Sequence, residues 1–91
     1  MGVTPVTPTV GERYGLDAGT TGLLVTRVDP NGPAADAGLR PGDVIQEVDG
    51  TAVRAAAELR RVLRARPDRP ALVLLSRGGR PVYVTIRVEE S

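Results

Sequence analysis

The chain has 91 residues, in which 12 arginines are balanced by 11 acidic residues for a net charge of +1. It contains no cysteine and no histidine, which excludes disulfides, thiol catalysis, imidazole metal sites and Ser-His-Asp triads. The nearly neutral charge and the scarcity of aromatic residues argue against nucleic-acid binding, and no apolar run approaches the roughly 18 residues that a membrane span needs. We expect one domain over residues 1–91, with an ordered core over about 3–88, and no metal or cofactor site.

The first half of the chain alternates short strands with short helical segments. Thr7 suits the N-cap of a helical turn, and Pro8 suits its first position. Pro33 likewise suits the start of a second helical segment, and Gly38 its end, where a left-handed residue is favoured. These signals predict strands over 3–6, 21–28 and 43–48, and helical segments over 8–14 and 33–37.

The second half contains the one long helical pattern, over residues 54–66, and a hairpin. In the helical pattern four apolar residues recur on one side at helical spacing: Ala55, Leu59, Val62 and Leu63. Strands are predicted over 71–77 and 82–88, joined by a tight turn at Gly78-Gly79. Apolar residues alternate along the last strand and are expected to face one way; they are Val82, Val84, Ile86 and Val88.

These elements predict an α+β, mainly β domain. We expect five or six short strands in a partly open β-sandwich or barrel, capped by one short and one long helix.

The segment from Ala34 to Gly50, AADAGLRPGDVIQEVDG, resembles the PDZ domains of the HtrA/Do family of bacterial serine proteases. The helical stretch 57–63 and the ending around Gly78-Gly79 are similar to the same family, and among its members the second, C-terminal PDZ domain is the most similar. The resemblance implies a PDZ fold with the circularly permuted bacterial strand order, in which the strand that lines the peptide groove comes first in the chain.

The resemblance also implies where a peptide binds. PDZ domains add an extended peptide to an open sheet edge, beside a helix. Ala56, Arg60, Leu63 and Arg64 are expected to face this groove, with Leu59 and Val62 facing the core. The small Ala56 favours apolar ligand side chains, and Arg60 and Arg64 either attract acidic groups or form a solvated helix face. The full implied set is Met1, Gly2, Val3, Thr4, Val6, Ala56, Arg60, Leu63 and Arg64.

Two registers are open for the loop that would bind a terminal carboxylate, which needs converging backbone N–H groups. In the first, Met1-Gly2-Val3 is that loop, and Pro5 then stands where the strand should donate an N–H that proline lacks. In the second, the chain is about two residues short in front of the strand, and Val3 is the donor. We favour the second register.

By resemblance we expect a non-catalytic peptide-binding module of a periplasmic or extracytoplasmic serine protease, serving substrate recruitment or regulation. Its partners would be polypeptide C-termini, unfolded segments and other domains of the parent. No residue is expected to be catalytic, since Ser76 has no base available. One alternative is an interdomain or oligomerisation module with a degenerate groove, which Pro5 favours. Another is the PDZ domain of a site-2 or C-terminal-processing protease.

Overall fold

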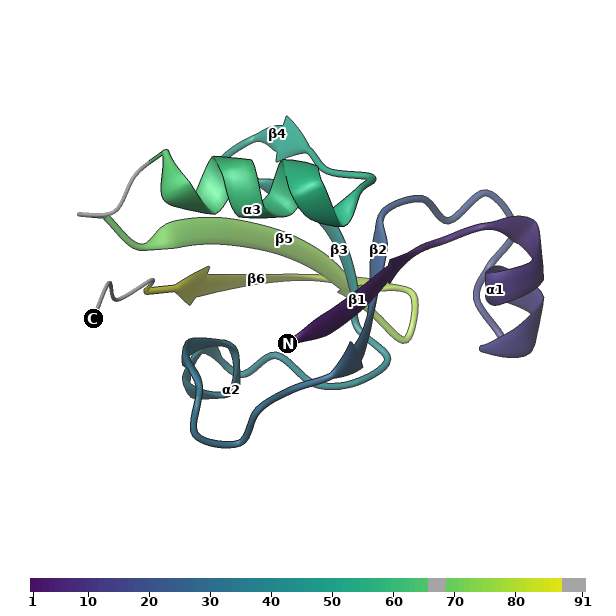
Figure 1. Ribbon diagram of the computed structural model, residues 1–91. Helices are drawn as coiled ribbons and strands as arrows, with labels where there is room; N and C mark the ends of the chain where they lie inside the picture. The colour runs from purple at the N-terminus through teal and green to yellow at the C-terminus, as the bar shows by residue number, and fades with distance from the viewer. Residues whose placement is uncertain (66–68, 88–91) are drawn as a thin grey trace.

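The computed structural model describes residues 1–65 and 69–87, which form one antiparallel sheet and three helices (Figure 1). The helices are α1 (Pro8–Arg13), α2 (Pro33–Ala37) and α3 (Ala56–Arg64). The strands are β1 (Gly2–Pro5), β2 (Leu23–Arg27), β3 (Val44–Val48), β4 (Thr51–Ala52), β5 (Ala71–Arg77) and β6 (Arg80–Ile86).

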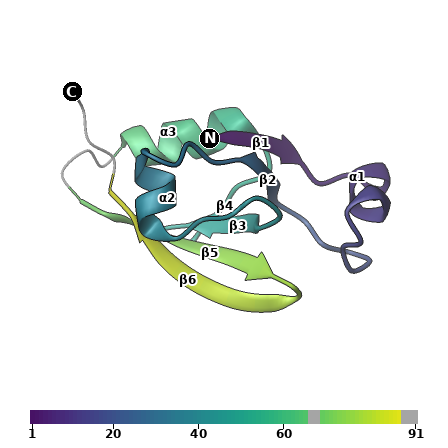
Figure 2. The same cartoon turned by 90° about the horizontal axis from the view of Figure 1, so that it is seen from below.

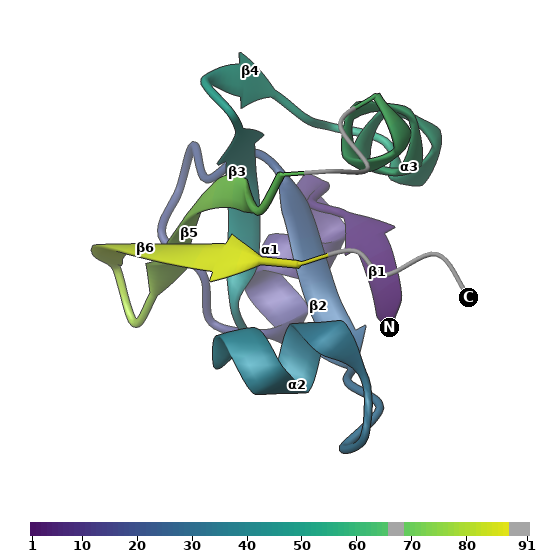
Figure 3. The same cartoon turned by 90° about the vertical axis from the view of Figure 1, so that its left-hand side faces the viewer.

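The sheet has the strand order β1-β2-β3-β5-β6, and the short β4 pairs with β3 outside this path. All the strand pairs are antiparallel. The sheet curves but does not close, so β1 and β6 are its two edges, with α3 next to β1 and α2 next to β6 (Figure 3). This is the predicted open mainly-β fold, and the edge strand next to α3 comes first in the chain.

Local signals placed the short helices correctly. Thr7 Oγ1 accepts a hydrogen bond from the Val10 N–H at 3.2 Å, as an N-cap should. Gly38 ends α2 in the left-handed conformation, with φ of 94°. The helical turn expected over 8–14 is the helix α1, so the described residues contain two short helices beside α3.

Several element bounds differ from those predicted. α3 begins at Ala56 rather than 54, because Ala55 is still extended at the N-cap and the Glu58 carboxylate accepts the Arg54 N–H at 3.0 Å. Residue 66 of the predicted helix lies outside the described residues. β1 begins one residue early, β6 begins at Arg80, and β4 was not predicted, because two residues carry no periodic pattern.

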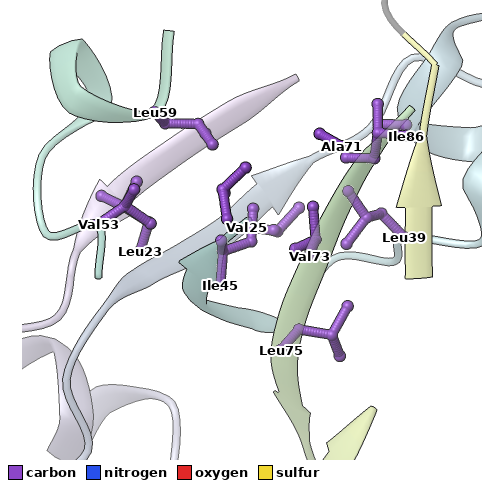
Figure 4. Close-up of a cluster of buried hydrophobic side chains, with 12 residues drawn as sticks. Leu23, Val25, Leu39, Ile45, Val53, Leu59, Ala71, Val73, Leu75 and Ile86 are labelled. Carbon is purple, nitrogen blue, oxygen red and sulfur yellow. The ribbon is translucent and has the colours of Figure 1, made fainter. Parts of the chain in front are cut away.

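The core is aliphatic and lies inside the curve of the sheet (Figure 4). Leu59 anchors α3 in this core and is 3% exposed. The predicted alternation of β6 is confirmed for its described part: Ile86 is buried and Val82 and Val84 are half-buried. Val88 lies outside the described residues. The fully buried side chains come mostly from the central strands: Leu23, Leu24, Val25, Val44, Ile45, Val48, Val53, Val73 and Leu75.

Candidate peptide-binding edge

β1 is an edge strand that pairs only with β2 among the described strands. The register sets Val3 opposite Val25, Thr4 opposite Leu24 and Pro5 opposite Leu23, with an irregularity between Gly2 and Val3. One side of β1 therefore remains open for an added strand.

The backbone hydrogen bonds show which groups of β1 face this open side. Val25 donates its N–H to the Asp43 carbonyl at 2.8 Å, and its carbonyl accepts the Gly42 N–H at 2.8 Å, both on the side away from β1. In an antiparallel pair, the N–H and C=O groups of two opposite residues point either both toward each other or both away from each other. Val3, opposite Val25, therefore points its N–H and C=O away from β2, toward the open side.

The same alternation assigns the remaining residues of β1. The Val6 N–H donates to the Gly22 carbonyl at 3.0 Å, so Val6 faces β2. Thr4 faces β2 as well, and Pro5 faces the open side with a carbonyl but no N–H. The open side thus offers one donor, at Val3, and acceptors at Val3 and Pro5. Pro5 was not among the predicted site residues, although alternation from Val3 points to its carbonyl.

α3 lies next to β1 (Figure 2). Ala56 and Leu63 are half-buried, whereas Arg60 and Arg64 are exposed. Positions 56, 60 and 63 share one face of a helix because neighbours on that face are three or four residues apart. Leu59 is buried and Val62 is half-buried against the core, as expected, but Leu63 also packs against the core, as does Val3 from the strand.

We use the name β1–α3 edge for Val3, Pro5, Ala56, Arg60, Leu63 and Arg64. Its electrostatics are positive on the helix side. Arg60, Arg61 and Arg64 are exposed, and none has an ion-pair partner in the described part of the chain. The one acidic residue of α3, Glu58, already binds the Arg54 N–H. Exposed arginines beside an open strand favour an acidic ligand group.

The first two residues lie at the start of this edge. Met1 precedes the strand and is 44% exposed, while Gly2 is already part of β1. A Cβ at Gly2 would lie 2.8 Å from the Thr26 Oγ1 on β2, so the two strands approach closely here. Gly2 and Val3 are therefore strand residues, and Val3 has the outward N–H that the second register requires.

Within the described ranges, no group of three or more Asp or Glu side chains is placed to hold a metal ion. None of the described helices is long and apolar enough to cross a membrane.

Comparison with known proteins agrees with this geometry. The family model for the PDZ domain matches residues 24–77. The chain therefore belongs to the PDZ domain family. A relative named a probable periplasmic serine endoprotease DegP-like, from Chlamydia trachomatis, is 33% identical over 93% of this chain, which spans 17% of that relative. The predicted resemblance to HtrA/Do-type proteases is thus confirmed.

Solved structures of the same type superimpose closely. The HtrA-type protease AlgW with a decapeptide is 35% identical, with a TM-score of 0.83 over 96% of this chain and 27% of AlgW. The PDZ domain of HtrA3 bound to a phage-derived ligand shares the fold, with a TM-score of 0.81 at 24% identity over 96% of this chain and 79% of that one. Similarity to a second, C-terminal PDZ domain stays a prediction.

Proposed function

We propose that this domain binds extended or C-terminal polypeptide segments at the β1–α3 edge, on behalf of an HtrA-type serine protease. The observation that carries this proposal is the open side of β1, where the Val3 N–H and the carbonyls of Val3 and Pro5 point away from β2 at the edge next to α3. A peptide added there continues the sheet, and its side chains alternate between the helix and solvent.

The residues of the β1–α3 edge suggest the kind of ligand. Ala56 and Leu63 present small and apolar side chains, which favour an apolar ligand residue against the helix. Arg60 and Arg64 favour a carboxylate, either of the chain terminus or of an acidic side chain. Because a short peptide buries little surface and must be ordered on binding, the affinity is expected to be weak.

The parent protein is proposed to be a periplasmic or extracytoplasmic serine protease, since the DegP-like relatives are named periplasmic endoproteases. In that setting the domain recruits substrates or regulates the protease without doing chemistry itself.

The proposal is tested by NMR titration of the ¹⁵N-labelled domain with a short peptide ending in valine and with its C-terminal amide. We expect amide shift changes along β1 and on the facing side of α3, and weaker binding of the amide. Val3→Pro removes the one outward N–H donor of β1 and adds a proline ring at the open side. The loss of one hydrogen bond to the peptide, together with the bulk of this ring, should weaken binding about tenfold.

Thr85→Pro is the matched control, because it also adds a proline to an edge strand but on the far side of the sheet. It should leave peptide affinity unchanged. Absence of shift changes at β1 and α3 with either peptide would reject the proposal and favour the interdomain module that Pro5 suggests.

A further inference from the structure

β6 is the second open edge of the sheet and is longer than β1. It spans Arg80–Ile86 and pairs only with β5 among the described strands. Open edges are sites where another strand can add, and proteins limit them with proline, charge or a covering helix. Here Pro81 stands near the start of the strand and α2 lies near its end.

Hydrogen bonds on the far side of β5 show how β6 is oriented. Leu72 donates its N–H to Asp49 Oδ1 at 2.9 Å and accepts the Asp49 N–H at 2.7 Å, both away from β6. Its partner Thr85 therefore points its backbone groups away from β5, toward the open side. By alternation Tyr83 and Pro81 do the same. This edge offers two donors, at Tyr83 and Thr85, where β1 offers one.

The sheet face beside this edge is apolar and exposed. Leu72 is 44% exposed and Tyr83 is 64% exposed, two of the largest apolar exposures among the described residues. The register places Leu72 opposite Thr85 and Leu74 opposite Tyr83, so these four side chains share one face. Contiguous exposed apolar residues mark interaction surfaces.

We propose that β6 pairs antiparallel with β6 of a second copy of this chain, about a two-fold axis at Val84. In this register Tyr83 of one copy lies opposite Thr85 of the other, so both donors and both acceptors of each copy are used. Pro81, which has no N–H, falls at the end of the paired region, opposite Arg87. The outward backbone groups of Tyr83 and Thr85 therefore all find hydrogen-bond partners in the second copy.

The side chains of the two copies are complementary in this register. On one face of the joined sheet, Leu72 and Thr85 of the first copy are followed across the strands by Tyr83 and Leu74 of the second copy. The two-fold axis generates a second, equivalent row of four side chains beside the first. The exposed leucines and tyrosines of both copies thereby form one patch, and such cross-strand pairs stabilise sheets. A surface that matches itself about a two-fold axis is the usual basis of a dimer.

Complementary charges also favour a second copy of this chain as the partner of β6. A cavity of about 310 Å³ lies between α2 and the end of β6, lined by Asn31, Pro33, Asp36, Ala37, Thr85 and Arg87. Pairing puts Pro81 of the second copy at the mouth of this cavity, with Arg80 next to it. Asp36 and Arg80 have no ion pair in the described part of the chain, so they are available to each other across the interface.

The dimer is expected to be weak, because one strand pair buries less than the roughly 1,000 Å² of a typical stable interface. Sedimentation equilibrium of the full 91-residue chain should show a monomer–dimer equilibrium. Hydrogen exchange should slow at the Tyr83 and Thr85 amides as concentration rises. Thr85→Pro removes one hydrogen bond in each half of the dimer, which should raise the dimer Kd about tenfold.

Val3→Pro, on the other edge, is the control and should leave the dimer Kd unchanged. Asp36→Arg and Arg80→Glu alone should each weaken the dimer, and the double variant should restore it; this arm does not depend on a proline variant folding. A chain that stays monomeric at all concentrations, or a double variant no better than the singles, would overturn the proposal. Neither result bears on peptide binding at β1.

Discussion

Asp43 and Arg77 form a bidentate ion pair between the start of β3 and the end of β5. Arg77 Nε donates to Asp43 Oδ1 at 2.9 Å and Nη2 donates to Oδ2 at 2.8 Å. Nη2 also donates to the Gly38 carbonyl at 2.8 Å, and the Arg40 N–H donates to Asp43 Oδ2 at 2.9 Å. The pair thus ties α2 and its following turn to the sheet. By accepting the Arg40 N–H, the Asp43 side chain also caps this turn.

Replacing Arg77 should destabilise the fold. The Asp43 side chain is 3% exposed and the Arg77 side chain 32%, so Arg77→Met would leave a buried carboxylate with only the Arg40 N–H. We expect a loss of about 2 kcal/mol in the free energy of unfolding, which is less than for a fully buried pair because Arg77 is partly solvated. Urea unfolding measures it, and Arg80→Met, at an exposed position opposite Arg77, should change little.

The contribution of Arg77 should not depend on pH in the ordinary range. The hydrogen bonds that Arg77 donates to the Asp43 carboxylate raise the pKa of Arg77 above its usual value. A group whose pKa is higher in the folded state stabilises that state at any pH below its pKa in the unfolded state. This stabilisation is lost only as the pH rises through the pKa of the folded state. The difference in unfolding free energy between wild type and Arg77→Met should therefore stay constant from about pH 7 to 10. A decline over that range would contradict the assignment.

Gly22 should be intolerant of any side chain. It has φ of 133°, and a Cβ there would clash with the backbone carbonyl oxygen of Ile45 in β3. Gly22→Ala is expected to cost about 3 kcal/mol of stability. Gly15 has φ of 68° but nothing within 4 Å of such a Cβ, so Gly15→Ala should cost only about 1 kcal/mol. Thermal or urea unfolding of the two variants would show equal losses if close approach to β3 were unimportant.

Leu59 and Leu63 should separate stability from binding. Leu59 is 3% exposed in the core, whereas Leu63 is half-buried on the β1–α3 edge. Leu59→Ala is expected to cost about 3 kcal/mol of stability, and Leu63→Ala about 1 kcal/mol. Peptide affinity of the folded fraction should fall more for Leu63→Ala. The opposite order in the titration would place the ligand elsewhere.

Arg60 and Arg64 should select acidic ligands if they face the bound peptide. The double variant Arg60→Gln and Arg64→Gln is expected to weaken binding of a peptide with an internal aspartate about threefold, and of its asparagine analogue little. The effect should shrink in high salt. Arg61→Gln is the matched control, one step around the same exposed helix. An equal loss for Arg61→Gln would indicate only the general charge of α3.

Local sequence patterns were sufficient to predict the fold class and most of the elements. The caps at Thr7 and Gly38 act within a few residues of chain, and the alternation of Val82, Val84 and Ile86 follows from strand geometry, so local patterns were sufficient. The start of α3 was less predictable, because it is set by the Glu58 side chain, which accepts the Arg54 N–H just before the helix, and this contact leaves no periodic pattern in the sequence. The two-residue β4 carries no pattern at all.

Only the pairing of the strands in three dimensions shows which edges are open and which backbone groups face outward. The outward N–H of Val3 depends on hydrogen bonds that Val25 makes to residues 42 and 43, and that of Thr85 on the contact between Leu72 and Asp49. These partners are distant in sequence, and a shift of one residue in register would reverse every assignment. The residues of a strand can be predicted from its own side chains, but the direction of its free hydrogen-bonding groups is set by its neighbours.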